Sequence, residues 1–125
     1  MTTAATLIRD VRERIAATMA EGPWTVHTVK PDDLAAPCIV VDRPSIAMDV
    51  QHHTFTVAVV AVGRRDGSTD AQLELDELTS WAMDAIAGPD FAVLRVDPGT
   101  ATIAELTYPA YDLTVACAVT YCTRE

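Results

Sequence analysis

The stretch TFTVAVVAV, residues 54–62, is the strongest strand signal in the chain and decides its fold. Its first half alternates threonine with larger apolar side chains, whereas its second half is apolar at every position. Alternation is typical of a strand with one face in water, and an unbroken apolar run is typical of a strand covered on both faces. We therefore expect a central strand of which one end is buried on both sides.

A turn and a helix are predicted directly after this strand. The segment 63–68 contains the turn pair Asp66-Gly67, and Thr69-Asp70-Ala71-Gln72 fits a capping box, in which Thr69 caps the helix. The helix is expected to run to Ala87, because Gly88-Pro89 cannot continue it. Its apolar residues recur at helical spacing on one face: Leu75, Leu78, Ala82, Ala85 and Ile86, with Leu73 and Trp81 beside them.

The segment before the central strand reads as one helix and two or three strands. Residues 4–20 carry an apolar stripe at helical spacing, and Gly22-Pro23 is predicted to end this helix with the glycine in a left-handed cap. Residues 24–29 alternate and residues 38–41 form a short apolar run, so both are predicted strands. The segment 45–53 is ambiguous between a loop and an irregular edge strand.

Three strands are predicted after the second helix, at 92–96, 101–108 and 112–122, with Asp97-Pro98-Gly99 as the turn between the first two. The element order is then α-βββ-α-βββ. Few helices and consecutive strands indicate an α+β fold, a mostly antiparallel sheet with two main helices packed on one face. The length of 125 residues suits a single domain, 1–125.

The net charge of −9 argues against two functional classes, proteins that bind nucleic acid and proteins that bind anionic membranes. An acidic chain is a poor binder of duplex nucleic acid or anionic lipid, because both attract an excess of lysine and arginine. The acidity is uneven: residues 1–69 hold eight acids and seven bases, whereas residues 70–125 hold ten acids and two bases. A subunit with this asymmetry is suited to pair head-to-tail with its own copies, although acids also simply keep a surface soluble.

The sequence contains no recognisable catalytic or ligand-binding motif. The three cysteines include no Cys-x-x-Cys pair, and we expect them to be reduced in a cytoplasmic environment. No hydrophobic stretch is long enough to span a bilayer, and the first residues lack the features of a signal peptide. We therefore expect no enzymatic activity, no cofactor, no metal site and no membrane partner.

Two groups of residues are candidates for contacts with other subunits. The helix after residue 68 carries a row of acids without a base, which reads either as a solvated face or as a negative wall in a lumen or interface: Glu74, Asp76, Glu77 and Asp84. The second group consists of loop arginines, tyrosines and an adjacent histidine pair: Arg64, Arg65, Tyr108, Tyr111, His52 and His53, the last two in the segment 44–53. The alternative is that the arginines are solubilising turn residues and that the tyrosines cap the edge of the core.

Five features follow one another over nearly the whole chain. They are a short N-terminal helix, the strand Pro37-Cys38-Ile39-Val40-Val41, the Thr/Val strand at 54–62, Arg64-Arg65-Asp66-Gly67 before an acidic helix, and a last strand entered through Tyr108-Pro109-Ala110-Tyr111. This layout resembles the tail terminator and tail-completion proteins of long-tailed bacteriophages (siphoviruses). The arginine-rich, lysine-poor composition is similar to that of versions from phages of high-GC actinobacterial hosts.

The resemblance implies an α+β subunit of a homohexameric ring at the junction of tail and neck in the virion, assembled in the host cytoplasm. Such a ring caps the tail tube, ends its polymerisation and joins the tail to the head. The implied partners are further copies of the chain, the major tail tube protein, the head-tail connector or stopper protein, and genomic DNA that passes without specific binding. The alternatives are another neck protein, a tail-tube-like protein, or a small ligand-binding or enzymatic α+β domain.

Overall fold

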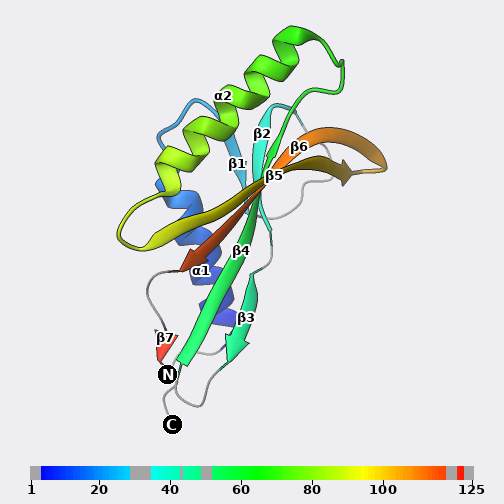
Figure 1. Cartoon of the computed structure of the whole chain (residues 1–125). Helices are drawn as coiled ribbons and strands as arrows, with labels where there is room; N and C mark the ends of the chain where they lie inside the picture. The colour runs from blue at the N-terminus through cyan, green and yellow to red at the C-terminus, as the bar shows by residue number, and fades with distance from the viewer. Residues whose placement is uncertain (1–3, 29–34, 43, 49–51, 118–120, 123–125) are drawn as a thin grey trace.

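A computed structural model of the chain describes residues 4–28, 35–42, 44–48, 52–117 and 121–122. Two helices and seven strands follow one another in these segments (Figure 1). They are α1 (Ala4–Thr18), β1 (Thr25–His27), β2 (Cys38–Val41), β3 (Ser45–Met48), β4 (His52–Val62), α2 (Thr69–Ile86), β5 (Phe91–Ile103), β6 (Leu106–Cys117) and β7 (Tyr121–Cys122).

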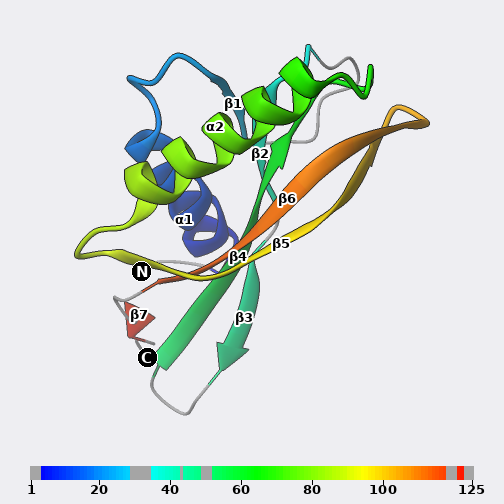
Figure 2. The same cartoon turned by 45° about the horizontal axis from the view of Figure 1, so that its top comes forward.

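The strands form one sheet with β4 at its centre. The main order is β1-β2-β4-β6-β5, and β3 and β7 pair with the first part of β4. β1 and β2 are parallel, and every other pair of strands is antiparallel. Both helices lie on the same side of the sheet (Figures 1 and 2). The predicted α+β class is therefore confirmed, and the ambiguous segment contains a true edge strand, β3.

The two faces of β4 differ in what covers them. Phe55, Val57 and Val59 point to the helical side and are buried in the main core with the apolar stripes of α1 and α2. Val62 points to the opposite side, where a second buried cluster joins β2 to the far end of the β5–β6 hairpin; its other members are Cys38, Val40, Ile103 and Tyr108. One end of the central strand is thus covered on both faces, as its apolar run predicts.

The predicted turn at Asp97-Pro98-Gly99 is wrong. β5 continues through these residues, and Pro98 pairs with Tyr111 in the ladder with β6. β5 is an edge strand, so the missing N–H of a proline there removes no bond that the sheet needs. The chain turns instead at Ala104 and Glu105, which have φ values of 51° and 68°. A tight two-residue hairpin turn of this kind requires positive φ even without glycine.

The predicted break before the last strand is also wrong, because β6 runs without interruption through Pro109. Pro109 pairs with Thr100 of β5 on one side. On the other side, the carbonyl of Pro109 accepts a hydrogen bond of 2.9 Å from the amide of Gly63. The result is one long hairpin in place of two separate strands and a turn. Its far end curls back over the sheet, where Ile103 and Tyr108 join the second cluster.

The two helices begin and end close to their predicted bounds, but for partly different reasons. Ser68, and not Thr69, caps α2: its Oγ accepts a bond of 3.1 Å from the amide of Ala71. Asp66 orients this serine by accepting from both its amide and its hydroxyl, and these bonds lower the pKa of Asp66. Gly22 does not have the predicted left-handed backbone. A Cβ atom there would lie 1.9 Å from Cζ2 of Trp81, so close packing against α2 requires the glycine.

Candidate functional site

Arg64 lies in the turn before α2 and is paired within its own chain. Its Nε donates to Oε1 of Glu74 at 2.8 Å, and its Nη1 contacts Oδ2 of Asp66 at 3.2 Å. The bond to Glu74 is the main cause of the raised pKa of Arg64. The arginine therefore joins the turn to the first turns of the helix. Pairing with the acids of a neighbouring subunit stays a prediction, and it would require Arg64 to share or exchange these partners.

Arg65 fastens the curled end of the hairpin to the same turn. Its Nε donates to the carbonyl of Thr107 at 3.1 Å, and its guanidinium lies 5.8 Å from the ring centre of Tyr108, a cation–π contact. Tyr108 is only 8% exposed, whereas Tyr111 is half-buried against the main core on the other face. The structure thus brings Arg64, Arg65 and Tyr108 together but separates Tyr111 from them. Both tyrosines occupy the edge of a core, as their alternative interpretation has it.

The two histidines predicted for the interface, His52 and His53, are the first two residues of β4. His53 pairs with Met48 of β3, and His52 pairs with Cys122 of β7. Consecutive residues of an extended strand point to opposite faces. The segment that contains both histidines is therefore strand at this point. Their side chains lie outside the part of the chain that the structure describes, as do residues 49–51.

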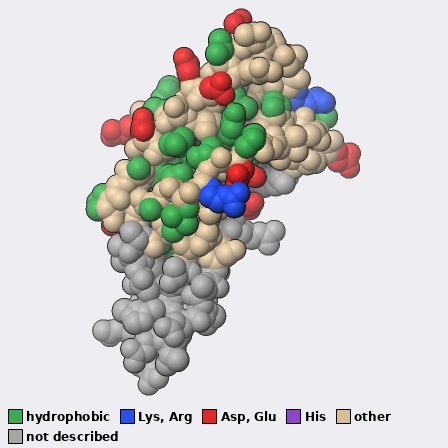
Figure 3. All heavy atoms as spheres, viewed as in Figure 1, with side chains coloured by type: hydrophobic (Ala, Val, Ile, Leu, Met, Phe, Trp, Pro, Cys, Tyr) green, Lys and Arg blue, Asp and Glu red, His purple; other side chains and the backbone are tan. Residues whose placement is uncertain are grey.

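The outer face of α2 combines acids with exposed hydrophobic side chains. Asp76, Glu77 and Asp84 are exposed, whereas Glu74 turns toward Arg64. Leu73 and Met83 belong to the same outer face and are 58% and 38% exposed. In the view of Figure 3, hydrophobic side chains gather over the middle, and most carboxylates stand around the upper outline. Three of the four acids predicted for this face are therefore exposed, and Leu73, which was expected beside the apolar stripe, lies on the outer face with them.

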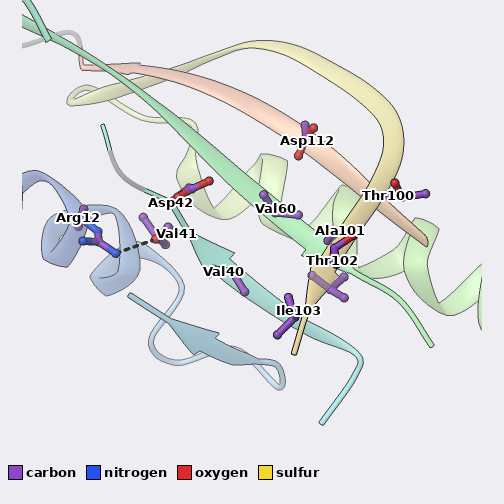
Figure 4. Close-up of a pocket in the computed structure, with 11 residues that line it drawn as sticks. Arg12, Val40, Val41, Asp42, Val60, Thr100, Ala101, Thr102, Ile103 and Asp112 are labelled. Carbon is purple, nitrogen blue, oxygen red and sulfur yellow. Dashed lines mark hydrogen bonds between the residues drawn. The ribbon is translucent and has the colours of Figure 1, made fainter. Parts of the chain in front are cut away.

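A groove of about 660 Å³ lies on the other side of the sheet, beneath the curled end of the hairpin (Figure 4). Its floor is apolar and consists of Val40, Val60 and Val62. The residues 100–103 of β5 form one wall, and the carboxylates of Asp42 and Asp112 stand at the rim. The sequence alone does not reveal this groove, because it depends on where a long hairpin curls over strands from the other half of the chain.

Asp112 is surrounded by like charges. It is the direct cross-strand partner of Asp97, and Asp42 lies close enough to act on it. Partial burial, followed by these two carboxylates, raises the pKa of Asp112. Asp97 is held by Arg95 at 3.1 Å, but within the described residues Asp112 itself has no hydrogen-bond or ion-pair partner. Ionised Asp112 therefore opposes folding, because its neighbours repel it and the sheet partly removes it from water.

Asp112 is exposed, so water screens this repulsion, and the variant Asp112→Asn should be more stable than the wild type at neutral pH by no more than about 0.5 kcal/mol. The raised pKa means that the folded state binds this proton more tightly than the unfolded state, so the wild type loses stability as the pH rises through it. Below the ordinary pKa of 3.8 the aspartic acid is neutral in both states, and the advantage of the variant should vanish. Urea unfolding at pH 7 and pH 3 measures both effects. An equal difference at the two pH values would contradict the electrostatic explanation.

The remaining groups of interest are possible metal ligands and the cysteine thiols. Within the described residues, no three side chains of histidine, cysteine, aspartate or glutamate are grouped to hold a metal ion. Cys38 is a buried free thiol, and burial raises its pKa to about 11, which keeps it protonated and unreactive. Cys117 is also buried. In the same part of the chain, neither helix is long and apolar enough to cross a membrane.

Comparison of the sequence with models of known protein families and with curated proteins found no match in either case.

Proposed function

We propose that this protein is a structural subunit that assembles head-to-tail into a ring, of the kind formed by the tail terminators of long-tailed bacteriophages. In this role six copies would cap the tail tube in the virion, end its polymerisation and meet the head connector or stopper protein. The proposal combines the sequence layout with the surfaces of the folded subunit. No catalytic step is part of it.

The observation that carries the proposal is that the two outer faces of the subunit are unlike. One face is the outer side of α2, with exposed acids around Leu73 and Met83. The other is the part of the sheet face that the hairpin end does not cover, where small side chains follow β4, β6 and the start of β5; they are Thr56, Ala58, Thr114, Ala116 and Ala92. Arg95, the cross-strand partner of Thr114, borders this patch. A ring uses a heterologous interface, which requires two different faces on each subunit.

The acidic face of α2 also fits the passage of DNA. Asp76, Glu77 and Asp84 are exposed, and the last turn of α2 contains no base that would neutralise them. Carboxylates that line a conduit repel phosphates, so DNA slides past without binding. Of the four acids predicted for this face, Glu74 is the least suited to this task because Arg64 occupies it.

Ring assembly is tested by placing a charge on the small-residue sheet face. Ala92 is exposed on β5 and pairs with Ala116, so Ala92→Glu should leave the fold intact but oppose contact between subunits. The control is Ala17→Glu, which adds the same charge at an exposed site on α1, a helix that belongs to neither face. Native mass spectrometry and negative-stain images of the wild type should show rings with some monomer. Ala92→Glu should shift the population to monomer by at least about tenfold, equivalent to about 1.4 kcal/mol per interface.

Three results bear on the alternatives. A wild type that stays monomeric at all concentrations and never associates with tail tubes would contradict the proposal, as would an Ala92→Glu variant that assembles like Ala17→Glu. Long filaments in place of closed rings would identify a tail-tube-like protein. The groove beneath the hairpin is the one observation that favours the other alternative, a binding domain, since its size falls in the range of ligand sites.

A further inference from the structure

The groove beneath the hairpin has a wall that is built from a strand edge. Four consecutive residues of β5, 100–103, line it. Successive side chains of a strand point to opposite faces, so a surface that touches four in a row lies along the edge of the strand and its backbone. β5 is the last strand in the sheet order, and this edge has no partner among the described strands. Backbone donors and acceptors therefore face the groove, as in sheets that bind an extended peptide.

The floor of the groove favours an apolar side chain of such a peptide, and the rim favours a positively charged one. Half-buried Val60 presents most of the apolar surface of the floor, because Val40 is only 6% exposed and Val62 is fully buried. This surface suits one small aliphatic side chain. Asp42 and Asp112 stand at the rim, and their charges are of one sign (Figure 4). Arg12 lies at the far end of the groove, but its guanidinium is turned to the backbone carbonyls of Thr28 and Val41. Asp112 thus receives no cation from the described part of its own chain.

We propose that this groove binds an extended segment of a partner protein that presents an arginine or lysine beside a small aliphatic residue. The segment adds a short strand to the free edge of β5 at residues 100–103, places its aliphatic side chain on the valine floor, and sets its cation between Asp42 and Asp112. The cation relieves the repulsion that Asp112 experiences in the free protein. This binding site does not depend on ring assembly.

A bare cation is a poorer occupant than a peptide. The carboxylates at the rim are not grouped as metal ligands, and neither the valine floor nor the strand edge would contribute to holding a small ion. A second copy of the chain is also a poorer occupant, because the described arginines of the turn and hairpin, Arg64, Arg65 and Arg95, are already paired within the subunit. A net charge of −9 further disfavours an approach between copies at this acidic rim.

The test is an NMR titration of the full ¹⁵N-labelled chain with a terminally blocked peptide of alternating valine and arginine. The matched control peptide carries citrulline, which has the shape of arginine without its charge. The arginine peptide should shift the amide signals of residues 100–103 and bind at least about fivefold more tightly than the citrulline peptide, the effect of one partly buried charge pair. Binding should weaken as salt is raised.

Variants separate the groove from the overall charge of the protein. Asp112→Asn should weaken binding of the arginine peptide by about fivefold while leaving the citrulline peptide unaffected. Asp84→Asn removes the same charge from the outer face of α2 and should change neither affinity. Equal losses for Asp112→Asn and Asp84→Asn would overturn the proposal, because attraction would then be non-specific.

Three other outcomes would also overturn it. They are equal binding of the citrulline peptide, equal binding of free arginine amide, and concentration-dependent shifts of the same amides without any peptide. The second result would mean that the site takes a small cation, and the third would mean that a second copy occupies the groove.

Discussion

Replacing Leu78 with alanine is expected to lower the free energy of unfolding by about 3 kcal/mol, the largest loss that we predict for any single substitution in this chain. Leu78 lies in the middle of α2 and is completely buried in the main core, where the helix packs on the sheet. Truncation removes the apolar contacts and leaves a cavity that the sheet can close only in part. Urea unfolding followed by circular dichroism measures the loss.

The same helix offers a matched control for this substitution. Leu73 is 58% exposed on the outer face, so Leu73→Ala deletes the same atoms from a site that contributes little to folding and should change stability by less than about 0.5 kcal/mol. If the outer face of α2 contacts a neighbouring subunit, Leu73→Ala should reduce the assembly of subunits into rings without lowering the stability of the monomer. Similar losses of stability for the two variants would contradict the placement of the helix faces.

Periodicity in the sequence predicts the architecture because it reflects burial on each element separately. The 54–62 strand and the apolar stripe of the second helix each identify a buried face without reference to the rest of the chain. The long hairpin could not be predicted in the same way. Asp97-Pro98-Gly99 has the composition of a turn, and only the position of β5 at the sheet edge makes a proline acceptable there.

The candidate sites also differ in how far the sequence predicts them. A site on one helix or strand can be predicted, whereas a site that several elements form together cannot. Glu77 and Asp84 are seven residues apart on one helix, so the face that they share follows from helical spacing. The partners of Arg64 and Arg65 are set by the folded turn: one arginine returns to Glu74, and the other reaches Thr107 on the hairpin. The groove needs β2, β4, β5 and β6 at once. Asp42 and Asp112 come from opposite halves of the chain and both line the groove, and no local sequence pattern predicts that they lie close together.

Arg12 is the residue for which we predict the second largest effect, and it shows how one polar side chain can secure the parallel edge of the sheet. β1 and β2 run in the same direction, so their final carbonyls point out at the same end. The Nη2 of Arg12 donates to the carbonyl of Thr28, just after β1, and at 3.3 Å to the carbonyl of Val41, the last residue of β2. A charged donor compensates both partly buried acceptors at once.

The variant Arg12→Ala should therefore lose about 2 kcal/mol of stability, measured by urea unfolding, because both carbonyls lose a charge-assisted bond and the aliphatic stem no longer packs. Arg9→Ala on the exposed part of α1 removes the same charge and should cost less than about 0.5 kcal/mol. Hydrogen exchange should show that Arg12→Ala increases opening of β1 more than opening of β4, since the lost bonds hold the short outer strand and not the centre of the sheet. A uniform increase over all strands would mean that Arg12 stabilises the fold through general packing and not through the two strand ends.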